Sequence, residues 1–200
     1  MTDWITHVVE TLGYLGIAGL MVLENVLPPI PSEVIMPLAG FTSARGELAF
    51  AGVAAAGTLG SVVGALLLYY LGRAIGERRL RAWVERHGRW LGLAPDDLDR
   101  VRERFDRDGP RVVLVSRLIP GVRSLISIPA GVAQMPLGPF LAYTAAGSGV
   151  WATLLAYAGR LLGANYGRVD HVLGPIALVV LLALAVALIA RGVRRRRSGG

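Results

Sequence analysis

The sequence contains no cysteine and no lysine, and these two absences exclude several classes of protein. Without cysteine, the chain has no disulfide framework, no zinc thiolate site and no thiol nucleophile. Without lysine, all 21 basic side chains are arginine, and the net charge is +7. A basic soluble protein would suggest a nucleic-acid partner, but here the arginines cluster beside apolar runs. This pattern is typical of the positive-inside rule for membrane proteins, so we expect no nucleic-acid partner.

Long polar stretches are also scarce, because 54% of the residues are hydrophobic and the mean hydropathy is +0.53. The apolar runs lie at roughly 12–41, 49–71, 112–135, 137–162 and 172–190. They leave little chain for a separate soluble domain, so we predict a single polytopic all-α membrane domain over residues 1–200. The N-terminus has no basic region, and no small-residue cleavage site follows an apolar core, so we expect no cleaved signal peptide.

Two of the apolar runs are interrupted by proline and by charge. The first contains Glu24 and Glu33, with Pro28, Pro29, Pro31 and Ser32 between them. The second contains Arg117 and Arg123, with the breaking or supporting residues Pro120, Gly121, Ser124, Pro129 and Gly131. Proline removes a backbone donor, and each unmatched backbone group in hydrocarbon costs several kcal/mol. We therefore predict two re-entrant hairpins, at roughly 18–41 and 112–135, in place of spanning helices.

The two halves of the chain resemble each other. An offset of 91 residues pairs Pro29 with Pro120 and Ala39-Gly40 with Ala130-Gly131. An offset of 87 residues aligns 60–76 with 147–163, where ten of 17 positions are identical. The shared residues include Gly-Ser, Tyr and Gly-Arg. Chance identity between two segments built from a few apolar residue types does not explain these matches. We predict a first repeat over 18–76 and a second repeat over 112–163.

The arginine-rich regions predict the topology. Residues 77–111, read as charged solvated helices, and the basic tail 191–200 should both be cytoplasmic. Spans at 139–160 and 174–190 return the chain to the side it left, so the hairpin at 112–135 must enter and leave on the cytoplasmic side. If the first hairpin mirrors it, that hairpin enters from the opposite face. This is the plan of an inverted-repeat transporter.

The two hairpins bring opposite charges to the predicted midplane. Glu24 and Glu33 come from the first, and Arg117 and Arg123 from the second. An arginine fork matches phosphate or carboxylate, and a buried carboxylate tends to take up a proton unless a guanidinium opposes it. The four residues are therefore candidates for binding an anionic head group and for proton coupling. The alternative is a structural ion-pair network that only holds the hairpins together.

Signals for other chemistry are weak. The three histidines are far apart and lack metal-ligand spacing, and no serine in the second hairpin has a histidine nearby in sequence. The glycines form no phosphate-binding loop between a strand and a helix. We therefore expect no cofactor, no metal and no enzymatic activity, and an integral-membrane lipid phosphatase is disfavoured.

At these residues the chain resembles the DedA family, also called SNARE-associated or VTT-domain proteins. The matching motifs are Glu24 with Pro28-Pro29-Ile30-Pro31-Ser32-Glu33, Phe105-Asp-Arg-Asp-Gly109, Ser116-Arg-Leu-Ile-Pro-Gly-Val-Arg-Ser124, Ile128-Pro-Ala-Gly131 and the 147–151 region. The resemblance implies a multi-pass protein of the bacterial inner membrane with two opposed re-entrant hairpins. It further implies movement of lipids such as undecaprenyl phosphate and phospholipids between leaflets, driven by the proton-motive force. Family functional residues would fall on Glu24, Glu33, Arg117 and Arg123, while Gln134 stands where many members carry a basic residue.

The sequence thus predicts a lipid translocase whose partners are an anionic lipid and protons, with its C-terminus in the cytoplasm. Association into a homo-oligomer is compatible with these spans. Two alternatives stay open: a proton-coupled transporter of small ions or solutes, and an envelope scaffold that transports nothing.

Overall fold

The computed structural model describes residues 2–26, 31–91, 95–120 and 122–162. These residues form helices and turns, and no strand is found among them. The helices are α1 (Thr2–Val26), α2 (Ser32–Ala44), α3 (Phe50–Leu91), α4 (Pro95–Arg117), α5 (Ser127–Val132) and α6 (Leu137–Leu162). Three of the predicted breaking residues, Pro28, Pro29 and Gly121, lie outside the described part, as do the expected span at 174–190 and the tail 191–200.

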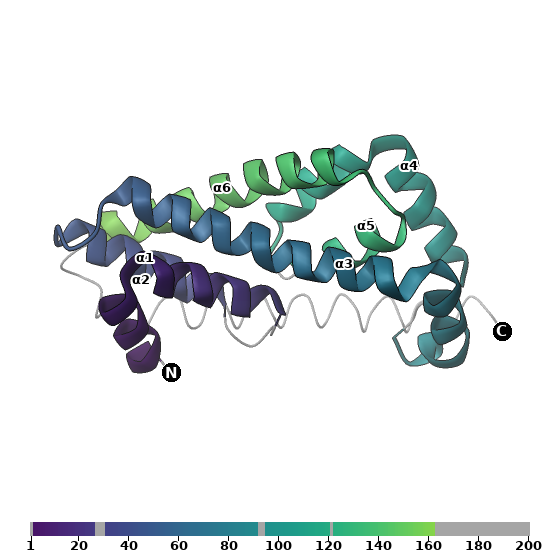
Figure 1. The fold of residues 1–200 in the computed structure, drawn as a ribbon, viewed down its shortest axis with the longest axis horizontal. Helices are drawn as coiled ribbons and strands as arrows, with labels where there is room; N and C mark the ends of the chain where they lie inside the picture. Colours follow the sequence, from purple (N-terminus) through teal and green to yellow (C-terminus); the bar gives the residue numbers. More distant parts are fainter. Residues whose placement is uncertain (1, 27–30, 92–94, 121, 163–200) are drawn as a thin grey trace.

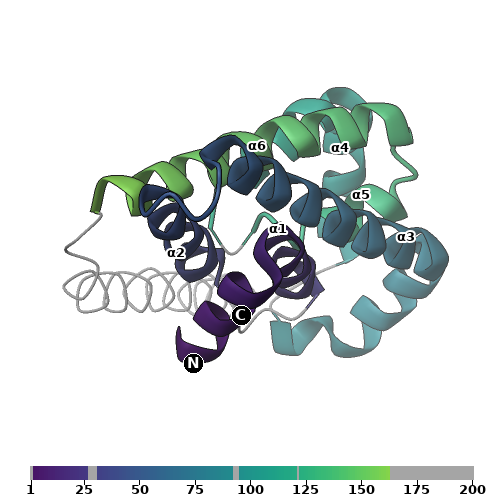
Figure 2. The ribbon, with the colours of Figure 1, turned by 60° about the vertical axis from the view of Figure 1, so that its left-hand side comes forward.

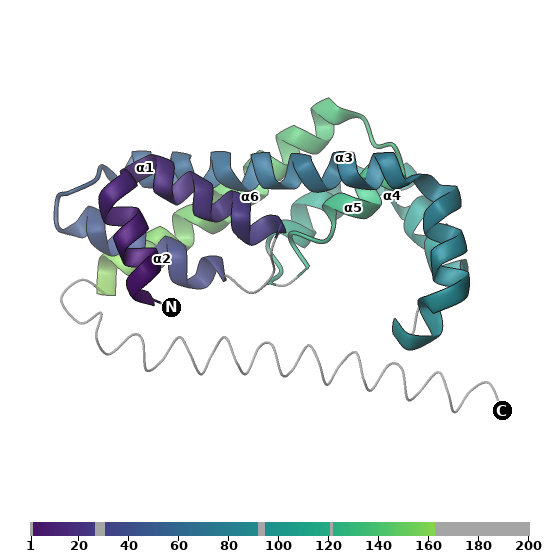
Figure 3. The ribbon, with the colours of Figure 1, turned by 60° about the horizontal axis from the view of Figure 1, so that its bottom comes forward.

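Two helix–break–helix segments approach each other near the middle of the molecule (Figures 1 and 3). The first consists of α1, the proline-rich break and α2, which begins after an extended Pro31 (φ −80°, ψ 131°). The second consists of the last part of α4, turns and a bend over 118–120 and 122–126, and the short helix α5. Proline ends a helix because its ring clashes with the preceding turn. The breaks therefore fall where the sequence predicts them.

The long helices α3 and α6 run antiparallel beside these segments (Figures 1 and 2). By length and hydropathy, two stretches in the described part qualify as candidate membrane spans, Trp4–Val26 in α1 and Phe50–Arg86, which covers much of α3. The sequence predicts a span at 49–71 and leaves the N-terminal helix undecided between spanning and surface positions. The structure extends α3 well past residue 71, with a bend at Gly76, whose φ of 68° is one that only glycine adopts readily. Residues beyond this bend leave the line of the apolar bundle.

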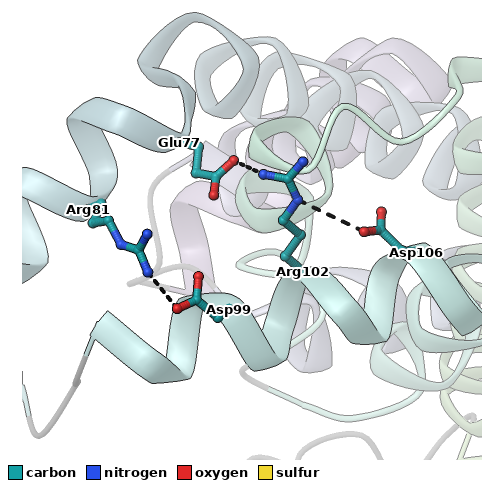
Figure 4. A network of polar contacts seen from close by, with 5 residues as sticks. All are labelled: Glu77, Arg81, Asp99, Arg102 and Asp106. Carbon is teal, nitrogen blue, oxygen red and sulfur yellow. Dashed lines mark hydrogen bonds and ion pairs between the residues drawn. The ribbon is translucent and has the colours of Figure 1, made fainter.

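A charged arm, defined here as residues 77–108, packs the end of α3 against the start of α4. Arg81 lies 2.5 Å from Asp99, Arg102 pairs with Glu77, and Asp106 lies 3.9 Å from Arg102 (Figure 4). The sequence predicts solvated helices here, and these side chains are indeed 40–68% exposed. The acidic and basic side chains also form ion pairs that join the two helices of the arm. Exposed pairs of this kind contribute at most about 1 kcal/mol each.

The short helices α2 and α5 are held at close range by glycine. Gly40 of α2 packs on the backbone carbonyl of Ala156 in α6, and Gly159 of α6 packs on that of Pro37 in α2. A methyl group at either glycine would overlap the opposing carbonyl, so the helices meet backbone to backbone. The short helix α2, from the first half of the chain, therefore packs on the long helix α6, from the second half.

The equivalent contact occurs at the other end of the molecule. Gly131 of α5 packs on the carbonyl of Tyr69 in α3, and Gly72 of α3 packs on that of Ile128 in α5. The offset of 91 residues relates Gly40 to Gly131 and Pro37 to Ile128, and the offset of 87 residues relates the two partner helices. Residues that match in the sequence repeat thus make matching contacts. The buried apolar residues accordingly form two clusters, one around Ile17, Met21 and Met36 and the other around Tyr69, Val113 and Phe140.

Candidate functional site

A buried ion pair joins the tips of the two broken segments. Nη2 of Arg123, in the turns between α4 and α5, lies 2.5 Å from Oε1 of Glu24, near the end of α1. Arg123 is 6% exposed and Glu24 is 8% exposed. The distance makes the contact an ion pair. One acid from the first segment and one arginine from the second therefore meet, as the sequence predicts.

Arg117 is the largest of the fully buried side chains in the described part and is 2% exposed. It is the last residue of α4, and its Nη2 donates a hydrogen bond of 2.7 Å to Oγ of Ser127 at the start of α5. The stem of Arg117 packs on Gly147 of α6, where a methyl group would lie 2.6 Å from its Cβ. Its Nε has no hydrogen-bond partner among the described residues. A buried guanidinium with an unused donor is a ready binding group for an anion.

Glu33 occupies the first turn of α2, where it is half-buried. It forms no ion pair with any residue that the structure describes. It is nevertheless close enough to interact with the charge of Glu24, as Arg117 and Arg123 also are. The structure therefore gathers all four charged residues predicted from the sequence into one cluster, but only Glu24 and Arg123 are in direct contact.

Two residues that the sequence analysis did not assign to the site support it. Asn25 donates hydrogen bonds from Nδ2 to the carbonyl of Met21, at 2.9 Å, and to Oε2 of Glu24, at 3.3 Å. Ser127 holds Arg117, as described above. The signal for Asn25 was its position beside Glu24 in an otherwise apolar helix, where a buried amide requires a partner. The signal for Ser127 was weaker, because serine is common in helices that pack closely.

Two serines among the predicted supporting residues are buried. Ser32 is fully buried, and its Oγ has no partner among the described residues, while Ser124 is 8% exposed. Near Pro120, the backbone N–H groups of Val122 and Arg123 both donate to the carbonyl of Ile119. These hydrogen bonds satisfy backbone groups that a proline break would otherwise leave unmatched.

Gln134, the position at which the resemblance leads us to expect a basic residue, is exposed. It has a positive φ of 52° and follows α5. The backbone N–H of Gln134 donates to the carbonyl of Gly131, and the backbone N–H of Met135 donates to the carbonyl of Ala130. This is the left-handed cap that ends many helices. In this chain, position 134 therefore terminates α5.

Comparison with known proteins identifies the family. The sequence pattern of the VTT domain matches residues 30–161. A relative from Staphylococcus aureus (strain NCTC 8325 / PS 47), named undecaprenyl phosphate transporter A, is 35% identical over 97% of this chain and 96% of its own length. Its namesake in Bacillus subtilis (strain 168) is 33% identical over 94% of this chain and 88% of its own length. A relative in Lactococcus lactis subsp. lactis (strain IL1403), named alkaline phosphatase-like protein, is 40% identical over 94% of this chain and 89% of its own length. No solved structure matches.

The two transporter names agree with the expectation of a non-enzymatic protein. The domain match covers well over half of the chain, and the relatives align with almost all of it. The residues matched by the domain include the segment with both buried arginines. The chain therefore belongs to the VTT-domain (DedA) family of bacterial membrane proteins, a family that includes proteins named as transporters.

Proposed function

We propose that this protein moves an anionic lipid between the leaflets of the bacterial cytoplasmic membrane and that the proton-motive force drives the movement. The observation that carries the proposal is the buried Glu24–Arg123 ion pair, with Arg117 beside it, at the meeting point of two broken segments. The names of two relatives support undecaprenyl phosphate as one such lipid, and phosphatidylglycerol likewise has a negatively charged head group.

In the proposed arrangement, the two broken segments are re-entrant hairpins that enter a single membrane domain from opposite faces. The matching glycine contacts of α2 and α5 support an inverted repeat, since each short helix packs on the long helix of the other half. The charged arm and the C-terminal tail are cytoplasmic, because both are rich in arginine. The site then lies near the midplane, where transporters of this plan bind their substrates.

The arginines recognise the head group. A guanidinium stays charged and presents a planar fork that matches the oxygens of a phosphate. Arg117 is already oriented by Ser127, and its Nε donor is unused by the described residues. Arg123 is occupied by Glu24, so an incoming phosphate must replace that carboxylate. Such an exchange keeps both arginines paired and avoids the cost of an isolated buried charge.

Glu24 couples this exchange to a proton. When Glu24 takes up a proton, it no longer neutralises Arg123, and the cluster gains affinity for an anion. When the proton leaves, the carboxylate competes for Arg123 again and expels the lipid. The total charge of the four residues is zero with Glu24 ionised, and it is zero again with Glu24 protonated and one monoanionic head group bound. The proton therefore makes the loaded site electrically equivalent to the empty one.

The test is lipid movement in liposomes that contain the purified protein, a fluorescent phosphatidylglycerol and an imposed pH gradient. The proposal predicts that the labelled anionic lipid changes leaflet, that the pH gradient accelerates it, and that a zwitterionic phosphatidylcholine probe moves more slowly. Passage of small ions with no lipid movement would support the small-ion or solute alternative. If neither lipids nor small ions move, the result would support the alternative of an envelope scaffold that transports nothing.

A further inference from the structure

Both long helices carry a signature of tyrosine, any residue, glycine and arginine near the end of their apolar part. In α3 it is Tyr70-Leu-Gly-Arg73, and in α6 it is Tyr157-Ala-Gly-Arg160, related by the offset of 87 residues. The glycine of each signature is buried against the short helix of the other half. The tyrosines are 49% and 52% exposed, and both arginines are exposed as well. Within each signature, tyrosine and arginine are three residues apart and therefore share one face of the helix.

The two signatures lie at opposite ends of the molecule. Because α3 and α6 are antiparallel, one signature lies beside α5 and the other beside α2 (Figures 1 and 2). Each is thus next to the base of one hairpin, while the charged cluster lies between the tips. If the hairpins enter from opposite faces, as proposed above, one signature faces each leaflet.

In both signatures an aromatic residue holds the arginine, at one end through the face of a ring and at the other through a tyrosine hydroxyl. The guanidinium of Arg160 lies 5.5 Å from the ring centre of Phe50, and this ring makes an edge contact with Tyr157 at 6.4 Å. At the other end, Nη1 of Arg73 donates a hydrogen bond of 3.4 Å to the hydroxyl of Tyr69.

Neither arginine has a carboxylate partner among the residues that the structure describes. Arg45 is different: it lies 5.8 Å from the ring centre of Phe41, but it also forms an ion pair of 2.9 Å with Glu47. The ring of Phe50 holds the guanidinium of Arg160 without using its N–H groups, and the hydroxyl of Tyr69 accepts from only one nitrogen of Arg73, so both guanidinium groups keep donors for an anion. Arg73 and Arg160 therefore retain a binding capacity that Arg45 has used.

We infer that the Tyr70–Arg73 and Tyr157–Arg160 pairs are two docking half-sites for the phosphate of a membrane lipid, one in each leaflet. The inference rests on the proposed translocation, since it gives the head group a place to bind before and after the central cluster. Each arginine binds the phosphate, and each exposed tyrosine packs on the part of the lipid just below it. The competing explanation is that both pairs are interfacial anchors, as tyrosine and arginine often are at the edge of a bilayer.

The test is photo-crosslinking in native membrane vesicles of both orientations. The probe is a phosphatidic acid analogue with a photoreactive group next to its phosphate, added to the outer leaflet, and labelled peptides are identified by mass spectrometry. With the probe activated immediately after its addition and the pH gradient collapsed, so that transport does not carry it across, the half-site inference predicts labelling at Tyr70–Arg73 from one vesicle orientation and at Tyr157–Arg160 from the other. Arg73→Gln and Arg160→Gln should each reduce labelling of their own peptide about tenfold or more and leave the other unchanged. Excess unlabelled phosphatidic acid should compete, whereas free inorganic phosphate and phosphatidylcholine should not.

The matched controls are Arg45→Gln, an arginine on an aromatic ring with its own carboxylate, and Arg78→Gln, an exposed arginine past the bend in α3. Neither should change the labelling. Labelling that survives Arg73→Gln and Arg160→Gln, or that any lipid competes away, would overturn the inference in favour of simple anchoring. Competition by inorganic phosphate would also overturn it, because the sites would then bind a soluble anion. Failure of the proposed function is separate: the wild-type protein would then show this labelling yet move no lipid in liposomes.

Discussion

The replacement of Glu24 by glutamine is the most informative perturbation of the buried cluster. Glutamine keeps the size of the side chain and its capacity for hydrogen bonding, but it cannot ionise. In the structure, Glu24 lies 2.5 Å from Nη2 of Arg123, and both residues are at least nine-tenths buried. The substitution therefore leaves a buried guanidinium without its counter-charge. Arg117, close by, adds a second positive charge to the same volume.

The size of the effect follows from the cost of an unmatched buried charge. Removing one partner of a buried ion pair typically costs about 3–5 kcal/mol. For a chain of this length, each kcal/mol lowers the melting temperature by roughly 2–4 °C, so Glu24→Gln should lower it by roughly 6–20 °C. The double variant Glu24→Gln/Arg123→Gln should recover most of this loss, because no unmatched charge remains.

The assay is thermal unfolding of the purified protein in detergent, with Glu33→Gln as the matched control. Glu33 is half-buried and forms no ion pair within the described residues, so its substitution should cost no more than about 1 kcal/mol. The same variants are then compared for pH-dependent lipid movement in liposomes. The proposal expects Glu24→Gln to abolish the response to pH. If Glu24→Gln melts like the wild type, the ion pair is not the buried contact described above. If it is destabilised but keeps a normal pH response, Glu24 holds the hairpins and does not carry the proton.

Two further predictions concern packing and topology. Gly40→Ala should lower the free energy of unfolding by about 1–3 kcal/mol or more, because the added methyl group meets a backbone carbonyl. Gly138→Ala, in the first turn of α6, places its methyl group in open space and should be neutral or stabilising. Thermal unfolding of the two variants compares them directly. Single cysteines at Gly88 and Ser198 should react with an impermeant thiol reagent only from the cytoplasmic side, and one at Val169 only from outside. Labelling of Gly88 and Val169 from the same side would remove the parity argument and the inverted repeat with it.

Proline and charge predicted the two breaks beside the charged cluster, between α1 and α2 and after α4. They did not predict the non-helical residues Gly13, Gly76 and Asp108, and Pro37 and Pro110 lie inside helices. The start of α4 at Pro95 also follows from local chemistry, since proline suits the first turn of a helix. These features depend on neighbouring residues alone.

The partners within the cluster could be predicted only as a group. The sequence places two acids on one hairpin and two arginines on the other, but it does not set how far each tip reaches past its counterpart. In the structure, this reach pairs Glu24 with Arg123 and leaves Arg117 bonded to Ser127 of its own segment. Asn25 was missed for the same reason, since its bond to Glu24 matters only once that carboxylate is known to be buried.

The crossed packing of the two halves was not predicted at all. Helical periodicity indicates which face of a helix is apolar, but it does not indicate which helix will cover that face. The repeat did contain the signal: Gly40 and Gly131 match each other, and so do Gly72 and Gly159. Their use as backbone contacts between halves becomes visible only in three dimensions.

The central claim is that two buried arginines recognise the phosphate of a lipid by their planar forks. The most direct measurement is the rate of leaflet exchange of fluorescent phosphatidylglycerol in liposomes for Arg117→Lys and Arg123→Lys, with the exposed Arg104→Lys as the control. Lysine keeps the charge but loses the fork, so both site variants should lose at least about tenfold in rate while the control matches the wild type. Wild-type rates in both site variants would contradict the claim and leave only a diffuse role for the positive charge.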